Sequence, residues 1–189
     1  MHPFVPFPKL SRLFRETIIT EKIDGTNAQV WVQEDGTVIA GSRTRWITPE
    51  SDNFGFAAWV RDHEAELRDG LGVGHHFGEW WGKGIQSGYG LDHRRFSLFN
   101  VSRWADSAVR PACCGVVPTL YVGPFSEEAV RVAAETLNSA GSVAAPGFMR
   151  PEGVVVFHAA SGTLYKYTPY HGHDGHKGHA HDKVAHAAP

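Results

Sequence analysis

Glu21-Lys22-Ile23-Asp24-Gly25-Thr26-Asn27 is the stretch around which this sequence is organised. It lies between an apolar pair, Ile18-Ile19, and the alternating run Gln29-Val30-Trp31-Val32. Apolar or alternating runs bounded by turn residues are typical of β-strands, and Asp-Gly is a common turn pair. The pattern therefore predicts that Lys22 ends one strand, directly before a turn. A lysine in such a position is usually only a surface charge, so its neighbourhood alone does not define a function.

Further strands and two helices are predicted on the C-terminal side of this stretch. The strand-like segments are residues 28–32, 37–40, 75–81, 96–101, 153–157 and 163–167. Asp35-Gly36 between the first two of them predicts a hairpin. Helices are predicted over residues 54–67, after Ser51-Asp52, and over residues 126–139, where Ser126 is the expected N-cap. Residues 1–17 predict only a short amphipathic turn. Many strands with few helices indicate an α+β protein.

Length and composition fit one soluble domain. The chain has 189 residues with 42% hydrophobic and 12% aromatic side chains, which are ordinary values for a globular protein. No apolar run approaches the roughly 20 residues that span a bilayer. The N-terminus lacks the basic start and apolar core of a signal peptide. We therefore expect no membrane association and a cytoplasmic location.

Charge and cysteine content narrow the function classes. The formal net charge is −2, which is not the basic balance of many nucleic-acid-binding proteins. A nucleic-acid substrate would therefore need arginines gathered on one face. Cys113 and Cys114 are adjacent and are the only cysteines, so a structural disulfide and a zinc site are not expected.

Five more motifs follow the lysine stretch in a fixed order. They are Ser42-Arg43-Thr44, Phe77-Gly78-Glu79-Trp80, Phe96-Ser97-Leu98-Phe99-Asn100-Val101, Glu152-Gly153-Val154-Val155-Val156 and Leu164-Tyr165-Lys166. In this order they resemble the motifs of the covalent nucleotidyltransferase superfamily, which holds ATP-dependent DNA and RNA ligases and mRNA capping enzymes. Thr26-Asn27 and Gly84-Ile85-Gln86 look most like the nick-sealing RNA ligase 2-like family. The resemblance runs from about residue 20 to residue 168.

The resemblance implies a fold and a reaction. The fold would be an ATP-grasp-like nucleotidyltransferase domain of antiparallel sheets, flanked by helices around a nucleotide cleft. Lys22 would be the catalytic nucleophile that carries AMP during ATP-dependent RNA ligation. Attack requires the neutral amine, and an ordinary lysine titrates near 10.4, so the site must favour loss of the proton. DNA ligase and capping enzyme are the alternatives within the superfamily.

The resemblance also implies the residues of the nucleotide site, namely Glu21, Asp24, Asn27, Arg43, Glu79, Phe99, Glu152 and Lys166. Glu79 would bind the ribose or support the lysine, and Glu152 would help coordinate a metal. Phe99 would stack on the purine, and Arg43 would contact a phosphate. Taken only as residues, Glu79 is also compatible with a surface carboxylate and Glu152-Gly153 with a plain turn.

Cofactors and partners follow from the same resemblance. ATP would donate AMP, and Mg²⁺ or Mn²⁺ would be the metal, since hard divalent ions prefer oxygen ligands. RNA would be the substrate. Many ligases use a second, C-terminal domain to clamp nucleic acid, and no foldable segment follows Lys166 here. A partner protein that supplies this clamp is therefore expected.

Two positions depart from the resembling families. Phe157 and Thr168 stand where those families usually carry a lysine. Fewer cations would weaken the stabilisation of charge on the phosphates. These two positions favour a different possibility, a domain that binds nucleotide or RNA without catalysis. Lys22, Glu79 and Glu152 favour the enzyme.

The last residues differ from the rest in composition. Residues 171–189 contain six histidines among glycine, alanine, aspartate and lysine. So polar a segment predicts a disordered tail, and the domain is expected to span residues 1–170. Scattered histidines bind transition metals weakly, and a specific metal site is the less favoured interpretation of this tail.

Overall fold

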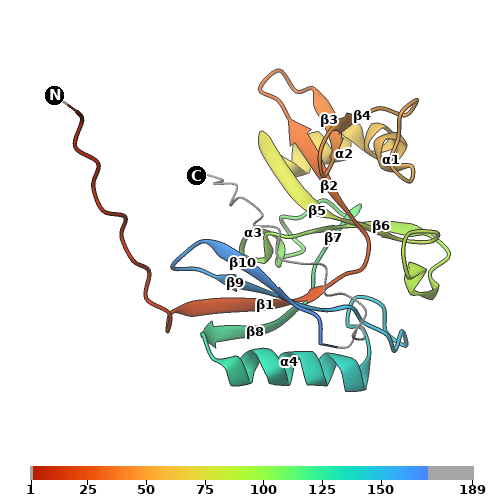
Figure 1. Cartoon of the computed structure of the whole chain (residues 1–189). Coiled ribbons are helices and arrows are strands. Elements are labelled where there is room, and N and C mark those ends of the chain that lie inside the picture. The colour runs from red at the N-terminus through yellow and green to blue at the C-terminus, as the bar shows by residue number, and fades with distance from the viewer. Residues whose placement is uncertain (1, 170–189) are drawn as a thin grey trace.

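Two β-sheets form the framework of the protein, and the chain passes from one to the other at the lysine stretch (Figure 1). The computed structural model describes residues 2–169. The four-stranded sheet has the order β10-β9-β1-β8, and the six-stranded sheet has the order β4-β3-β2-β5-β6-β7. All neighbouring strands are antiparallel except β6 and β7. The predicted α+β class, with mostly antiparallel sheets and few helices, is confirmed.

The strands and helices have the following bounds. The four-stranded sheet contains β1 (Glu16–Lys22), β8 (Thr119–Pro124), β9 (Gly153–His158) and β10 (Thr163–Tyr167). The six-stranded sheet contains β2 (Thr26–Val32), β3 (Val38–Ser42), β4 (Trp46–Ile47), β5 (Gly74–Gly82), β6 (Arg94–Leu98) and β7 (Cys114–Val116). The helices are α1 (Phe56–Asp62), α2 (Glu64–Leu71), α3 (Val101–Trp104), α4 (Glu127–Ala140) and the 3-10 turn η1 (Gly88–Gly90).

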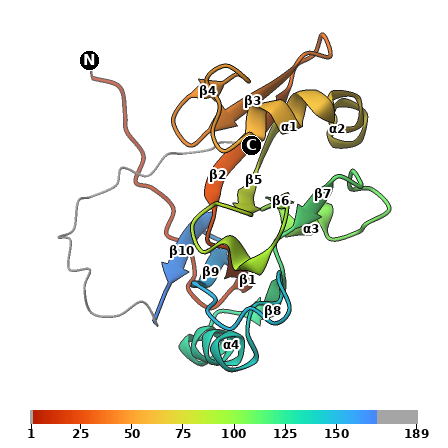
Figure 2. The ribbon, with the colours of Figure 1, turned by 90° about the vertical axis from the view of Figure 1, so that its right-hand side faces the viewer.

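Three apolar clusters hold these layers together. The first joins one face of the six-stranded sheet to α1 and α2, with Val30, Phe56 and Phe96 fully buried. A second lies between the two sheets and contains Ile18 and Trp81. The third packs α4 against the other face of the four-stranded sheet (Figure 2). One face of each sheet is therefore covered by helices, and the lysine stretch lies where the sheets meet.

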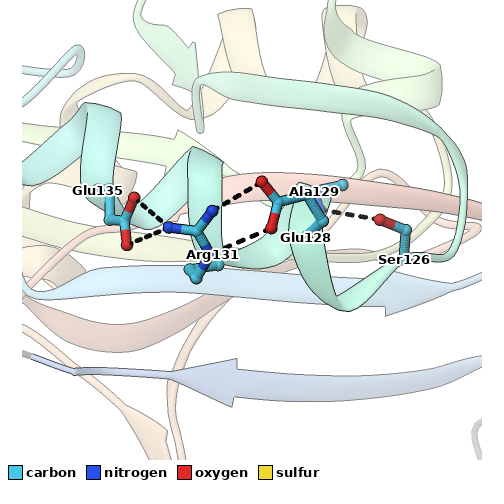
Figure 3. A network of polar contacts seen from close by, with 5 residues as sticks. All are labelled: Ser126, Glu128, Ala129, Arg131 and Glu135. Atoms are coloured by element: carbon cyan, nitrogen blue, oxygen red, sulfur yellow. Dashed lines mark hydrogen bonds and ion pairs between the residues drawn. The ribbon is translucent and has the colours of Figure 1, made fainter.

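Helix α4 shows how a local sequence signal sets an element. Ser126 Oγ accepts a hydrogen bond from the Ala129 N–H at 3.0 Å, which confirms the predicted N-cap. Arg131 forms ion pairs with Glu128 at 2.7 Å and with Glu135 at 2.6 Å along the exposed face (Figure 3). Exposed pairs at these spacings add only a few tenths of a kcal/mol each, roughly 0.2–0.5. Packing of Ala134 and Leu137 onto the sheet therefore matters more for this helix.

Several predicted elements are corrected by the structure. The helix predicted over residues 54–67 is two helices that meet at His63. The strand predicted over residues 96–101 ends at Leu98, and Val101 already begins α3. The short amphipathic turn predicted near the N-terminus is absent, because residues 2–15 form no regular turn of helix and are exposed. Strands β7 and β8 were not predicted.

Two sequence-based expectations concern other parts of the chain. The histidine-rich residues 171–189, with their expected disorder and weak metal binding, lie outside the described residues. Within residues 2–169, none of the helices has the length and apolar character needed to cross a bilayer.

Candidate active site

Lys22 is the last residue of β1 and lies where the two sheets meet. It pairs with Gly153 of β9, and its side chain is 26% exposed. Its Nζ contacts Glu152 Oε1 at 2.5 Å, in the only ion pair that the described residues form between the lysine stretch and another motif. Side chains alternate along a strand, so Lys22 points to the face opposite α4. The structure thus joins two motifs that are 130 residues apart.

Glu152 has the features of a cation ligand. One carboxylate oxygen holds Lys22, and the other, Oε2, is buried and has no hydrogen-bond partner among the described residues. A buried carboxylate oxygen left without a partner is costly unless a donor or a cation meets it. Hard divalent cations bind such oxygens. The residues therefore fit a divalent ion at Glu152, although residues 2–169 contain no cluster of three or more His, Cys, Asp or Glu side chains suited to metal binding.

Glu79 approaches this pair from the six-stranded sheet. It lies on β5 opposite Asn27 of β2, and Asn27 Nδ2 donates a hydrogen bond to Glu79 Oε2 at 3.2 Å. Burial, the largest cause, raises the pKa of Glu79 to about 7; the Lys22 charge acts against this rise, and the Glu152 charge adds to it. Glu79, Lys22 and Glu152 therefore act electrostatically on one another at one site.

Gly25 lets the lysine stretch lie close against β5. A Cβ atom at this position would lie 2.6 Å from the Trp80 carbonyl oxygen and 2.9 Å from Glu79 Cγ. Such distances are well inside normal contact, so any larger residue must push the lysine stretch away from β5. The glycine of the motif is explained by this close approach.

Glu21 has a different place from the one that the sequence suggested. It is 1% exposed and points to the opposite side of β1 from Lys22. Its carboxylate accepts hydrogen bonds from Ser142 Oγ at 2.5 Å and from the N–H groups of Val143 and Ala144 at 2.8 and 2.9 Å. Burial raises the pKa of Glu21 although these bonds lower it. Glu21 thus anchors the segment after α4 to β1 and does not line the site with Lys22.

Asp24 is held by a turn that the sequence did not connect with it. Its Oδ2 accepts a hydrogen bond from the Ser87 N–H at 3.1 Å, and its own N–H donates to the Tyr89 hydroxyl at 2.7 Å. Burial raises the pKa of Tyr89 far above its ordinary value, so the hydroxyl keeps its proton. Tyr89 packs on Trp81 with ring centroids 4.9 Å apart. Tyr89 is thus a supporting residue that sequence reasoning missed, because nothing in the sequence ties it to Asp24.

The remaining predicted residues are Arg43, Phe99 and Lys166, and within residues 2–169 none of them forms a hydrogen bond or ion pair with Lys22. Arg43 directly follows β3 and is exposed. Phe99 directly follows β6, is 40% exposed, and its N–H donates to the Phe77 carbonyl at 3.0 Å. Lys166 lies on β10 opposite Val155, so it shares with Lys22 the face of the sheet opposite α4. No hydrogen bond or ion pair of the Arg43 or Lys166 side chain is present within residues 2–169.

Two comparisons with known proteins found similarities to this chain. The family model for RNA ligase matches residues 15–168. A variant of Naegleria gruberi RNA ligase with AMP and Mn has a TM-score of 0.63 at 16% identity, over 82% of this chain and 50% of that one. A second variant of that ligase, with ATP and Mn, has a TM-score of 0.60 at 17% identity, over 81% and 48%.

At such low identity, the structural likeness establishes a shared fold. The chain spans about half the length of these RNA ligase structures. No significant match was found among curated proteins. The family model covers most of the sequence, from before β1 to the residue after β10. The chain therefore belongs to the RNA ligase family.

Proposed function

We propose that this protein is an ATP-dependent RNA ligase in which Lys22 forms the covalent lysyl-AMP intermediate. The observation that carries the proposal is the contact between Lys22 Nζ and Glu152, beside the buried Glu79, at the junction of the two sheets. Membership of the RNA ligase family supports it, as do the AMP and ATP in the two related structures.

The reaction would proceed in three steps. Lys22 Nζ, after losing a proton, attacks the α-phosphorus of ATP, a P–N bond forms, and the bond to pyrophosphate breaks. The RNA 5′-phosphate then attacks the AMP phosphorus and releases the lysine. Finally, the RNA 3′-hydroxyl attacks the 5′-phosphate, seals the strand and releases AMP. Each step is a phosphoryl transfer, which depends mainly on positioning and on stabilisation of charge.

The residues of the site have distinct proposed tasks. Glu152 is the carboxylate in contact with the ammonium and orients it; Glu79 with Asn27 contacts the ribose. Phe99 stacks on the adenine, while Asp24, Arg43 and Lys166 lie around the nucleotide, with the two cations toward the phosphates. The resemblance implies that Glu21 binds the nucleotide, but its hydrogen bonds favour a different task, holding β1 to the segment after α4. When bound at Glu152, Mg²⁺ or Mn²⁺ would neutralise charge on the phosphates.

The first test asks whether Lys22 is the labelled residue. Lys22→Arg keeps a positive charge beside Glu152 but removes the amine nucleophile, so we expect no covalent label from α-³²P-ATP with Mg²⁺ or Mn²⁺. Lys9→Ala, which removes an exposed lysine, should label like the wild type. Labelling is read on a denaturing gel. A labelled Lys22→Arg protein would rule out this assignment.

A second candidate function is nucleotide or RNA binding without catalysis. Thr168 favours this candidate. It lies next to Gly153, and Gly153 pairs with Lys22, so Thr168 is level with Lys22 across the sheet. The resembling families usually carry a lysine at the position of Thr168. Wild-type protein that binds ATP by calorimetry but forms no label would support this candidate. Labelling with GTP instead of ATP would favour a capping-type activity. Sealing of nicked DNA in preference to RNA would favour a DNA ligase.

A further inference from the structure

A row of rings, three of them exposed and the fourth half-buried, crosses the open face of the six-stranded sheet. It consists of Trp46, Trp31, His75 and Phe77, called here the aromatic row. Ring centroids are 5.3 Å apart for Trp46–Trp31, 5.0 Å for Trp31–His75 and 6.1 Å for His75–Phe77. The ring planes differ by 23°, 8° and 11°, so the rings are nearly parallel.

The aromatic row is not part of the apolar core. Trp31, His75 and Phe77 alternate along β2 and β5 with the buried residues Val30, Val32 and His76. Trp46 alternates in the same way with the buried Ile47 on β4, so the row lies on the face opposite α1 and α2. Trp46 is 45% exposed and Phe77 is 53% exposed. Large rings gathered on a surface often mark a binding site, whereas single exposed ones need no explanation.

The sheet is shaped to admit this row. Gly41 lies between Gln29 on β2 and Trp46 on β4 in the register. A Cβ atom at Gly41 would lie 3.0 Å from the Trp46 ring and 2.7 Å from Gln29 Cγ. The missing side chain therefore lets the Trp46 ring lie over the sheet toward Trp31.

The aromatic row is continuous with the candidate active site. Phe77 pairs with Gln29, two residues along the strands from the pair Glu79–Asn27, which corresponds to about 7 Å. Phe77 also neighbours Phe99 through a backbone hydrogen bond. At the other end, Trp46 follows the turn that carries Arg43 and Arg45, and both arginines are exposed. The row of rings thus begins beside Glu79 and ends beside two exposed arginines.

We infer that the aromatic row is a stacking site for unpaired bases of the RNA strand, and this inference rests on the proposed function. Bases stack on aromatic side chains whatever their identity, while nearby arginines meet the phosphates. Near-parallel rings with open ends at Phe77 and Trp46 suit this mode of binding. Gln29 and His75, whose Oε1 and Nδ1 atoms are 3.3 Å apart, offer polar atoms to base edges. The position beside Glu79 would hold one RNA end near Lys22.

The test compares RNA affinity with labelling by ATP. A fluorescein-labelled single-stranded RNA of ten nucleotides is titrated with full-length protein, and binding is followed by anisotropy. We expect Trp46→Ala to weaken RNA binding about tenfold, which is a typical effect of removing one ring that stacks on a base. Trp46→Phe should retain most of the RNA affinity. Phe14→Ala, which removes an exposed ring on the N-terminal segment, should bind as the wild type does. If the melting temperature of Trp46→Ala is well below that of the wild type, His75→Ala replaces it as the test variant.

Other readouts separate the possible outcomes. Labelling of Lys22 by ATP should stay within about twofold in Trp46→Ala, and the same RNA in a perfect duplex should bind with no dependence on Trp46. Unchanged RNA affinity in both variants, or absence of RNA binding by the wild type, would overturn the inference. So would loss of ATP labelling together with RNA binding, which would assign the row to the ATP site. Dissociation of a wild-type dimer by Trp46→Ala in sedimentation would assign the row to protein contact instead. Absence of labelling in the wild type contradicts the proposed function but leaves the RNA titration interpretable.

Discussion

At the junction of the two sheets, Glu79 is buried and the charge of Lys22 acts on it. The sequence identified both through their motifs, since the residue types and their order are local signals. It did not reveal that Lys22 is partly buried against Glu152, or that burial brings the pKa of Glu79 to about 7. These properties depend on residues that are 52 to 130 positions apart, so no local pattern reports them.

The raised pKa makes folding stability depend on pH. In the unfolded chain Glu79 loses its proton near 4.5, and in the folded protein near 7. Between these values folding takes up a proton, so the contribution of Glu79 to stability falls as pH rises through this window and stays low above it. Glu79→Gln removes this dependence and keeps an oxygen to accept from Asn27.

We therefore expect Glu79→Gln to be more stable than the wild type at pH 8, by on the order of 2 kcal/mol, and nearly equal to it at pH 5. Urea unfolding at the two pH values measures this, with the exposed Glu34→Gln as control. ATP labelling should fall in the same variant, because the ribose contact is lost. A variant that is less stable than the wild type at pH 8 would show that Glu79 is ionised and well paired.

At the scale of elements, strand alternation separates neighbours in the sequence. Lys22 and Glu21 are adjacent, yet one points to the site and the other to the segment after α4. The alternation was available from the sequence and argues against both side chains lining one site. The partner of Glu21 was not available, because Ser142 lies 121 residues away.

Glu21 is expected to be the strongest structural anchor of β1. Glu21→Ala leaves the Ser142 hydroxyl and the N–H groups of Val143 and Ala144 without an acceptor in a buried place. Each unsatisfied group costs about 1–3 kcal/mol, so we expect a loss of roughly 3 kcal/mol or more in unfolding free energy. Glu21→Gln keeps one acceptor oxygen and should lose distinctly less. Equal losses in the two variants, measured by urea unfolding, would contradict the anchoring role.

At the scale of the whole molecule, the sequence predicted the class and the order of the motifs better than the connections. Strands β9 and β10 and helix α4 were placed to within a residue, because alternation and the Ser126 cap are local signals. Strands β7 and β8 were missed, since neither presents a clear alternating run. The two-sheet arrangement depends on pairings between distant strands, such as β1 with β8 and β9, which no single segment encodes.

All residues proposed for the nucleotide site lie between Lys22 and Lys166, on strands of the two sheets or within two residues of a strand end. Ending the chain after Tyr170 should therefore leave the melting temperature and the ATP labelling of Lys22 nearly unchanged. The reason is compositional, because residues 171–189 carry few apolar side chains to bury.

Ending the chain after Gly162 is the matched control. That change removes β10, which pairs with β9 along its whole length and carries Lys166, so both stability and labelling should fall sharply. Thermal melts and gel labelling of the two truncated proteins measure these effects. A large drop in melting temperature for the chain that ends after Tyr170 would show that the histidine-rich segment contributes to the fold.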